Sequence, residues 1–169
     1  LDRLRRTGVV AAEVAGLPGA PGPVGRASGA GEDVRTSRPY GAYPLFHLVP
    51  LDVTPDGDAL ARAWVRVEEI AESCRLAGES LGLLDAEPPG SWCGAFEAAD
   101  GTALGWVEAP QGEVLYLVEI VDGHIGQVKA RTASFHNFSL FSHAFGGDIL
   151  TDFAFIEASF GVTMAGVAG

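Results

Sequence analysis

The sequence is poor in the residues that build disulfide frameworks and cysteine-ligated metal sites. Its 169 residues include two cysteines, Cys74 and Cys93. They form no C-x-x-C pair of the kind that binds zinc or an iron–sulfur cluster, and they are too few for the disulfide scaffold of a small secreted protein. The cysteine content therefore favours a reducing, cytosolic location.

Basic residues are also scarce. Eleven Lys and Arg stand against 22 Asp and Glu, which gives a net charge of −11. Nucleic acid attracts clusters of Lys and Arg, so this balance argues against a nucleic-acid partner. Six of the eleven basic residues lie within residues 1–38, where they are available to meet an acidic surface.

Long apolar runs are missing too. The first residues, LDRLRRTGVV, lack the apolar core of a signal peptide, and no stretch approaches the roughly 20 apolar residues that span a bilayer. We therefore expect a soluble or peripheral protein without its own membrane span. The chain starts at Leu1, and its last twelve residues carry no charge. Such apolar ends predict packing against a missing part of the same polypeptide, or self-association.

Gly and Pro dominate residues 16–44. Because glycine costs backbone entropy and proline removes a hydrogen-bond donor, no regular element is expected there. Two interpretations stay open: a disordered linker, or an ordered loop that fixes polar side chains over a scaffold. The second rests on six closely spaced residues: Arg26, Asp33, Arg35, Arg38, Tyr40 and Tyr43.

A long helix is predicted over residues 58–84, with Asp58 as its N-cap. Apolar residues recur there at alternating spacings of four and three, and we expect this stripe, which includes Cys74, to face the core. Its members are Leu60, Trp64, Val67, Ala71, Cys74 and Leu81, with Gly78 in the remaining position. The opposite, charged face is interpreted as a solvated face with ion pairs, made of Arg62, Arg66, Glu69, Glu72 and Arg75.

The rest of the chain predicts one hairpin and two helices. Alternating apolar residues before and after Asp122-Gly123 indicate an antiparallel hairpin over residues 113–131. Residues 138–160 read as two helices, the second capped by Asp148. The predicted fold class is α+β, mostly helical with one hairpin, in a single domain over residues 1–169.

Standard catalytic motifs are absent, but six segments in order resemble one family over the whole chain. They are RLRRTGVV, GPVGRASGAGEDVRTSRPYGAY, GDALARAWVRVEEIAES, VEAPQGE, VKARTASFHNF and GGDILTDFAFIEASFG. The family is the large, 49 kDa subunit of respiratory NADH:quinone oxidoreductase together with the large subunit of membrane-bound nickel–iron hydrogenases of the formate hydrogenlyase type. The resemblance implies that this chain is the C-terminal portion of a longer hydrogenase-like fold.

The resemblance also implies partners and cofactors. An iron–sulfur small subunit, with the cluster in that partner, an accessory subunit, and a missing N-terminal half or separate chain would complete the complex. The complex would be cytoplasmic, on the inner face of the cell membrane. No cofactor or metal is expected on this chain, and quinone would bind in a cavity shared with other polypeptide.

The positions that would carry metal chemistry are substituted. Where the hydrogenases resemble Asp-Pro-Cys-x-x-Cys, this chain has Gly161 for the aspartate and Thr163 and Gly166 for the cysteines. A nickel–iron centre needs thiolate ligands, which these residues cannot supply. In EAPQGE, Gln111 stands where the family has a basic residue that points into the cavity, and an amide carries no fixed charge.

Six cavity positions match the family: Arg26, Ser28, Asp33, Arg35, Glu108 and Glu113. Four of them, Arg26, Ser28, Asp33 and Arg35, predict a buried charged network beside the cavity, with two open roles. One is electron transfer toward quinone in a membrane-associated redox complex that lacks its own nickel–iron centre. The alternative is a non-catalytic assembly or interaction module in which Arg26 and Asp33 only tie the glycine-rich segment to the helices.

Overall fold

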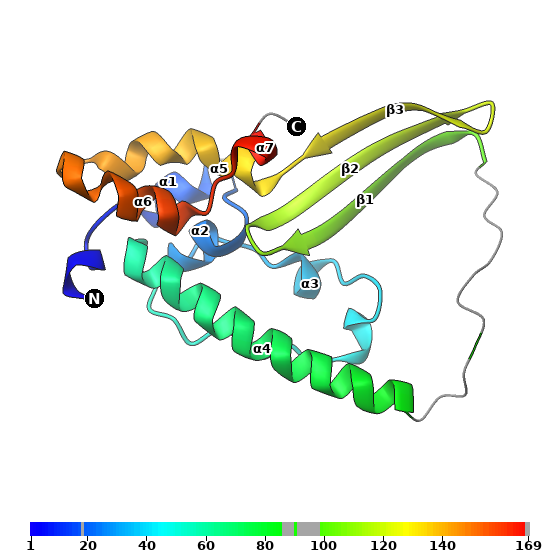
Figure 1. Cartoon of the computed structure of the whole chain (residues 1–169), viewed down its shortest axis with the longest axis horizontal. Coiled ribbons are helices and arrows are strands. Elements are labelled where there is room, and N and C mark those ends of the chain that lie inside the picture. The colour runs from blue at the N-terminus through cyan, green and yellow to red at the C-terminus, as the bar shows by residue number, and fades with distance from the viewer. Residues whose placement is uncertain (18, 86–89, 91–98, 168–169) are drawn as a thin grey trace.

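Helices and a three-stranded antiparallel sheet make up the chain, which confirms the α+β class (Figure 1). The computed structural model describes residues 1–17, 19–85, 90 and 99–167; Cys93 lies outside them. The helices are α1 (Ala12–Gly16), α2 (Gly22–Ala27), α3 (Val34–Ser37), α4 (Ala59–Asp85), α5 (Ala133–Phe141), α6 (Phe153–Phe160) and α7 (Met164–Val167). Short 3₁₀ turns are η1 (Asp2–Leu4), η2 (Tyr43–Leu45), η3 (Ser142–Phe145) and η4 (Leu150–Asp152).

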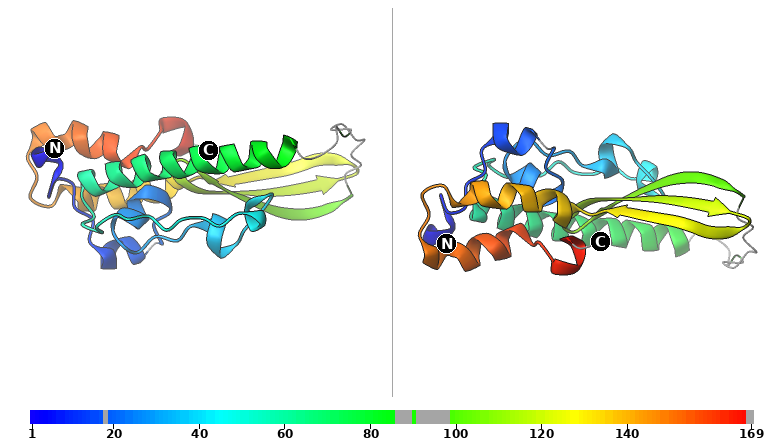
Figure 2. Two further views of the ribbon diagram at one scale, coloured as in Figure 1. Left: turned by 90° about the horizontal axis from the view of Figure 1, so that it is seen from below. Right: turned by 90° about the horizontal axis from the view of Figure 1, so that it is seen from above.

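The sheet has the order β1 (Gly101–Ala109), β2 (Gly112–Val121), β3 (His124–Arg131). It extends away from α1, α5 and α6, in the same general direction as α4, as Figures 1 and 2 show. The predicted hairpin is confirmed as β2–β3, and Asp122 (φ 51°) and Gly123 (φ 70°) have the positive φ angles of a type I′ turn. Sequence reasoning missed β1, because its two glycines and its alanines have little strand propensity. It pairs with β2 along its whole length.

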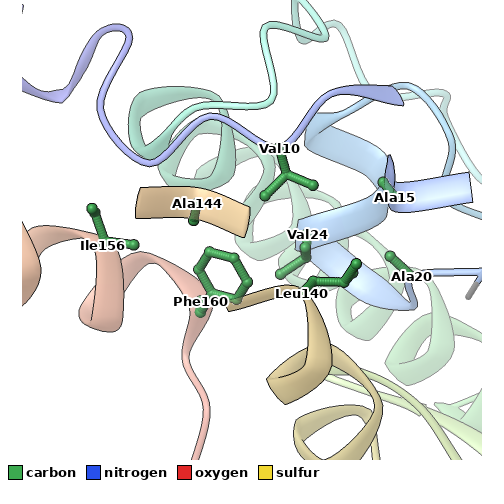
Figure 3. Close-up of a cluster of buried hydrophobic side chains, with 8 residues drawn as sticks. All are labelled: Val10, Ala15, Ala20, Val24, Leu140, Ala144, Ile156 and Phe160. Carbon is green, nitrogen blue, oxygen red and sulfur yellow. The ribbon is translucent and has the colours of Figure 1, made fainter. Parts of the chain in front are cut away.

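The helical part surrounds a small apolar core in which α2, α5 and α6 meet (Figure 3). Its buried members are Val10, Ala15, Ala20, Val24, Leu140, Ala144, Ile156 and Phe160. The two predicted C-terminal helices are present with shifted bounds, because Thr132 Oγ1 caps α5 by accepting from the Phe135 N–H. Asp148 does not cap α6; its carboxylate instead accepts from the Gly8 N–H at 2.9 Å.

Regular structure within residues 16–44 corrects the expectation of none. Both α2 and α3 lie there, and α2 begins where its backbone touches the β1–β2 turn. A Cβ atom on Gly22 (φ +68°) would lie 2.2 Å from the Gln111 carbonyl oxygen. The glycines that argued against a helix therefore allow one, because they let two backbones pack without side chains between them.

The long helix α4 lies within one residue of its predicted bounds at each end, but the face that points toward the protein is the one predicted to face solvent. Asp58 caps it, since Oδ1 accepts from the Ala61 N–H at 2.8 Å. The predicted core stripe faces outward: Trp64 is 48% exposed, Val67 50% and Leu81 63%, and Cys74 is exposed as well. The face interpreted as solvated turns inward, with Arg62 and Val65 each 0% exposed. Periodicity showed that the helix has two faces, but it could not show that ion pairs would make the polar one suitable for burial.

Arg62 joins three distant parts of the chain. Its Nη2 and Nη1 donate to the carbonyl oxygens of Gly8 and Gly57, each at 2.8 Å, and its Nε donates to Ser159 Oγ at 3.0 Å. The guanidinium also lies 4.6 Å from the centre of the Phe160 ring. Burial lowers the pKa of Arg62 to about 10, and the backbone oxygens of Gly8 and Gly57 take the place of water around the cation.

Replacing Arg62 by Ala should lower the free energy of unfolding by about 3–5 kcal/mol, because the buried Gly8 carbonyl oxygen would lose its Arg62 donor, the Gly57 carbonyl oxygen would keep only the Val10 N–H, and the packing on Phe160 would be lost. Arg62→Lys keeps the charge but cannot reach all three acceptors, and it should cost less. Urea denaturation would measure both. Arg5→Ala, at an exposed position, is the control and should stay within about 0.5 kcal/mol. A cost below about 1 kcal/mol for Arg62→Ala would contradict this role.

A strap of irregular chain, residues 46–53, is fastened to the inner side of α4. Glu72 accepts hydrogen bonds from the Val49 N–H at 2.9 Å and from Arg75 Nε at 2.7 Å. Arg75 in turn donates to the His47 carbonyl oxygen at 2.8 Å. The hydrogen bond from Arg75 lowers the pKa of Glu72 to about 2.

A carboxylate whose folded pKa is depressed stabilises the fold above its unfolded pKa, near 4.5, and loses this contribution as the pH falls toward 2. Glu72→Gln should therefore destabilise the chain by about 1 kcal/mol at pH 7, the size expected for a partly exposed pair. The difference from the parent should shrink between pH 4.5 and 2 in thermal unfolding. Glu119→Gln, at an exposed strand position, is the control. A difference that is constant with pH would exclude the ionised pair as its source.

Candidate functional site

Arg26 of α2 is the centre of a buried charged cluster. Its Nη1 donates to Glu108 Oε1 of β1 at 2.8 Å, and its Nη2 contacts Glu69 Oε1 of α4. The side chains of Arg26, Glu108 and Glu69 are 9%, 3% and 12% exposed. One guanidinium therefore ties a short helix, the sheet and the long helix together.

Asp33 and Arg35 extend the cluster from the start of α3. Asp33 caps this helix by accepting from the Arg35 N–H at 2.9 Å, and the Arg35 guanidinium binds the same carboxylate with two nitrogens. Arg35 Nη2 also lies 3.6 Å from Glu69 Oε1. Burial alone would raise the pKa of Asp33, but the hydrogen bonds and charge of Arg35 outweigh it and lower that pKa.

Glu108 has the opposite shift. Burial raises its pKa even though Arg26 lies beside it. Its backbone N–H donates to Tyr40 Oη at 2.8 Å, which fixes the strand end, while its Oε2 is buried without a hydrogen-bond partner among the described residues. Glu108 is thus a carboxylate whose pKa is moved toward neutral pH and which retains an unused acceptor.

Arg66, one turn after Arg62 on α4, completes the cluster. Its Nη1 donates to the Arg62 carbonyl oxygen at 3.1 Å, whereas its Nη2 is buried with no acceptor in the described part of the chain. Burial lowers the pKa of Arg66. A Cβ atom added to Gly161 would lie 2.9 Å from this Nη2 and 3.8 Å from Gln111 Cγ. Two substituted positions, 111 and 161, therefore meet at Arg66.

A cavity of about 290 Å³ opens against this cluster. Its lining combines Arg35, Arg66, Glu69 and Glu108 with Tyr43, Ile70, Ser73, Ala109, Pro110 and Gln111. A hollow of about 370 Å³ lies on the side of the strap, with Arg26 and Asp33 in its wall. A larger hollow, about 760 Å³ beside Arg5 and Asp58, contains none of the clustered charges. The 290 Å³ cavity is the better candidate site because Arg66 and Glu108, which each have an atom without a hydrogen-bond partner among the described residues, line it and not the 370 Å³ hollow.

Four of the six predicted cavity residues come together: Arg26, Asp33, Arg35 and Glu108. Ser28 is buried apart from them, and its Oγ donates to the Val24 carbonyl oxygen at 2.9 Å inside α2. Glu113 belongs to a second ion-pair group, where it binds Arg38 and, at 3.1 Å, Arg131. Ser28 and Glu113 therefore lie outside the Arg26 cluster.

The cluster also contains three residues, Arg66, Glu69 and Tyr40, for which the sequence predicted no role in a site. Glu69 and Arg66 were interpreted as part of a solvated face, and Tyr40 had no assigned contact. The charge pattern of α4 could have predicted the burial of Arg66 and Glu69. A face that carries both acids and arginines can be buried when a second set of charges, here from residues 26–35, pairs with it.

Thr163 and Gly166, which the family resemblance places at hydrogenase ligand positions, form local hydrogen bonds. The Gly166 N–H donates to Thr163 Oγ1 at 3.1 Å, and the Gly166 carbonyl oxygen accepts from Thr132 Oγ1. These residues offer no thiolate, so they do not fit a nickel–iron centre. Within residues 1–17, 19–85, 90 and 99–167, no group of three or more His, Cys, Asp and Glu is placed to hold a metal ion.

Comparison with known proteins identifies the family. The model of the respiratory-chain NADH dehydrogenase 49 kDa subunit matches residues 1–92 and 90–168. This chain belongs to that family. The match confirms the resemblance found in the six sequence segments.

Two relatives are each 34% identical to the chain. A subunit of the NADH-quinone oxidoreductase of Opitutus terrae matches over 163 residues, 89% of this chain and 38% of that protein. The alpha subunit of the membrane-bound hydrogenase of Pyrococcus furiosus matches over 172 residues, 93% of this chain and 40% of that protein. The chain thus spans about two fifths of the length of these relatives.

A solved structure supports the same fold. A chain of the membrane-bound sulfane sulfur reductase, an archaeal respiratory membrane complex, superimposes with a TM-score of 0.84 at 28% identity. The match covers 99% of this chain and 47% of that chain. None of the helices that the structure describes in this chain is long and apolar enough to cross a membrane.

The free donor on Arg66 predicts that a carboxylate at position 161 would stabilise the fold. Gly161 has a left-handed backbone (φ +65°), which costs a non-glycine residue about 1 kcal/mol. A charge-assisted hydrogen bond contributes about 1.5–3 kcal/mol. Gly161→Asp should therefore be more stable than Gly161→Ala by about 2 kcal/mol in urea denaturation, because only Asp gives Arg66 Nη2 an acceptor.

Arg66→Gln supplies the control for this prediction. In that background the difference between Asp and Ala at position 161 should nearly disappear, because the guanidinium is gone while the backbone strain is unchanged. Equal stabilities of the two variants in the parent chain would show that Arg66 Nη2 does not face position 161 in solution.

Proposed function

We propose that this chain acts as a large-subunit component of a membrane-associated redox complex, in electron transfer toward quinone and without a nickel–iron centre of its own. The observation that carries the proposal is the 290 Å³ cavity bounded by buried charges with unused hydrogen-bonding atoms, Arg66 Nη2 and Glu108 Oε2. Both atoms are buried in the wall of the cavity. Turned toward the cavity, Arg66 Nη2 can donate to a quinone carbonyl oxygen and Glu108 Oε2 can accept from a quinol hydroxyl.

The protein groups around the cavity suit this chemistry. Reduction of a quinone to a quinol consumes two electrons and two protons. Burial raises the pKa of Glu108, so this carboxyl holds a proton closer to neutral pH than an exposed glutamate does. Arg26 keeps the carboxyl in place through Oε1, and Tyr43, Ile70, Ala109 and Pro110 provide an apolar wall for a ring.

Electrons would come from outside this chain. The family relationship suggests an iron–sulfur small subunit as their source, with an accessory subunit and further large-subunit polypeptide around the same cavity. The complex would lie at the cytoplasmic face of the cell membrane. These partners follow from the relatives, whose names place them in a quinone oxidoreductase and a membrane-bound hydrogenase.

A second candidate is a non-catalytic assembly module. It is favoured by the substitutions at Gln111 and Gly161, which remove a family cation and a family acid at one point of the cavity, and by the local hydrogen bonds of Thr163 and Gly166. In this case the cluster around Arg26 only holds α2, α4 and β1 together, as a paired buried ion group does.

The test is purification of the tagged chain from its source cells, with intact masses of all recovered chains, iron and nickel content, and quinone reduction measured on one sample. We expect iron, an iron–sulfur subunit and no nickel. Arg26→Ala should lower quinone reduction at least about tenfold in assembled complex, because Glu108 and Glu69 lose their shared cation. Arg38→Ala, which removes an arginine from the separate Glu113 group, is the matched control and should stay within about twofold.

The outcomes separate the two candidates. A complex that assembles with iron but reduces quinone equally well with Arg26→Ala would rule out a role for the cluster in turnover. Recovery of the chain with partners but without iron or quinone reduction would favour the assembly module. Nickel in stoichiometric amount would contradict both.

A further inference from the structure

Two hydrogen-bond donors in the wall of the 290 Å³ cavity, on Arg66 and Gln111, have no acceptor in the described part of the chain. Arg66 Nη2 is buried, and no described carboxylate forms an ion pair with the guanidinium. The side-chain amide of Gln111, at the β1–β2 turn, makes no hydrogen bond to any described residue. The cavity can therefore bind an acceptor that the described chain does not provide.

Both donors converge on a position without a side chain. A Cβ atom on Gly161 would lie 2.9 Å from Arg66 Nη2 and 3.8 Å from Gln111 Cγ. Gly161 is the C-cap of α6 and has a left-handed backbone with φ 65°, the conformation that favours glycine at a helix end. Position 161 therefore supplies neither an acceptor nor a side chain that would separate the two donors.

The charges of the cavity wall favour an anion beside Arg66. Its acids, Glu69 and Glu108, both bind Arg26, which neutralises part of their charge. The second cation of the wall, Arg35, is paired with the N-cap carboxylate of its own helix. Burial lowers the pKa of Arg66, because its desolvation outweighs the attraction of Glu69. Arg66 is thus the cavity cation that lacks a counterion within the described residues.

We infer that this cavity binds a small monocarboxylate of the size of acetate between Arg66 and Gln111. A carboxylate has two acceptor oxygens, so one can accept from the guanidinium and the other from the amide. The guanidinium has to turn toward the cavity for this, and Nη2 loses no hydrogen bond when it does so. A volume of about 290 Å³ is at the small end of ligand pockets.

The remaining wall selects a ligand with one charge. Ile70, Ala109 and Pro110 offer apolar surface to a methyl group, whereas a second carboxylate would meet these side chains or the acids Glu69 and Glu108. The proposed function assigns Arg66 Nη2 to a quinone carbonyl oxygen, so a carboxylate would occupy the same donor. The inference otherwise needs the cavity alone, and its test contains no quinone.

Titration of the ¹⁵N-labelled chain with sodium acetate at constant ionic strength, followed by NMR, tests the proposal. We expect saturable shifts of the Gly161 backbone amide and the Gln111 side-chain amide. The dissociation constant should be on the order of 1–10 mM, because so small a ligand binds weakly. Acetamide has the shape of acetate without its charge, and it should bind at least about tenfold more weakly. Succinate, with a second charge, should also bind more weakly than acetate.

Three variants locate the anion. Arg66→Gln removes the cation, and Gly161→Asp gives the cavity a carboxylate of its own, so each should raise the dissociation constant of acetate at least about tenfold. Arg38→Gln removes a cation from the separate Glu113 group and should change the constant by less than about twofold. Gly161→Asp restores an acceptor to Arg66, so it tests the site even if Arg66→Gln fails to fold.

The outcomes are distinct from those that test the proposed function. Shifts that do not saturate below about 100 mM acetate, or that acetamide reproduces, overturn the inference. Equal affinities of the parent and Gly161→Asp for acetate also overturn it, because the anion then lies elsewhere, for example at Arg5 and Arg6 beside the 760 Å³ hollow. Absence of quinone reduction in the assembled complex contradicts the proposed function alone, since acetate binding is measured without quinone.

Discussion

The arrangement of the site depends on the pairing of Arg26 with Glu108 and Glu69. These residues come from a short helix, a strand end and the long helix, and each would be costly to bury alone. Once the guanidinium lies between the two carboxylates, burial becomes acceptable for all of them, and the charged face of α4 can turn toward the protein. The direction in which α4 faces, and therefore the position of the cavity, follows from this one contact.

Charge balance explains how the cluster tolerates the substitutions around it. Arg26, Arg35 and Arg66 face Asp33, Glu69 and Glu108, so cations and carboxylates are equal in number. The family resemblance places a basic residue at position 111 and an acid at position 161, and the structure shows that these two positions meet. Loss of both keeps its net charge near zero, while the hydrogen-bonding capacity of Arg66 is left unused.

Local signals predicted a large part of the fold. The Asp122-Gly123 turn predicted the β2–β3 hairpin. Asp58, together with the spacing of the apolar residues that follow it, predicted α4 to within one residue at each end. These features depend on backbone conformation and capping, which a short segment determines by itself. The strand β1 and the helix α2 were missed because their glycines weaken the local signal, and Gly22 serves close packing between segments that are distant in the sequence.

The candidate site was predictable to the extent that its residues lie in one motif. Arg26, Asp33 and Arg35 come from a single segment and do lie together, whereas Glu108 and Glu113, which share the EAPQGE motif, do not act together. They are cross-strand partners on β1 and β2, yet they bind different arginines. Which carboxylate joins which cation depends on the packing of α2 and α3 against the sheet, and no spacing rule in the sequence encodes it.

The exposed apolar face of α4 and the buried charged cluster around Arg26 are two consequences of the same packing. A helix with one apolar and one charged face can bury only one of them within this chain, and the arginines of residues 26–35 favour the charged face. The apolar face is then left exposed, with Trp64 48%, Val67 50% and Leu81 63% accessible to solvent. The ion pairs that build the cavity therefore also determine which face of α4 is left uncovered in the described part of the chain.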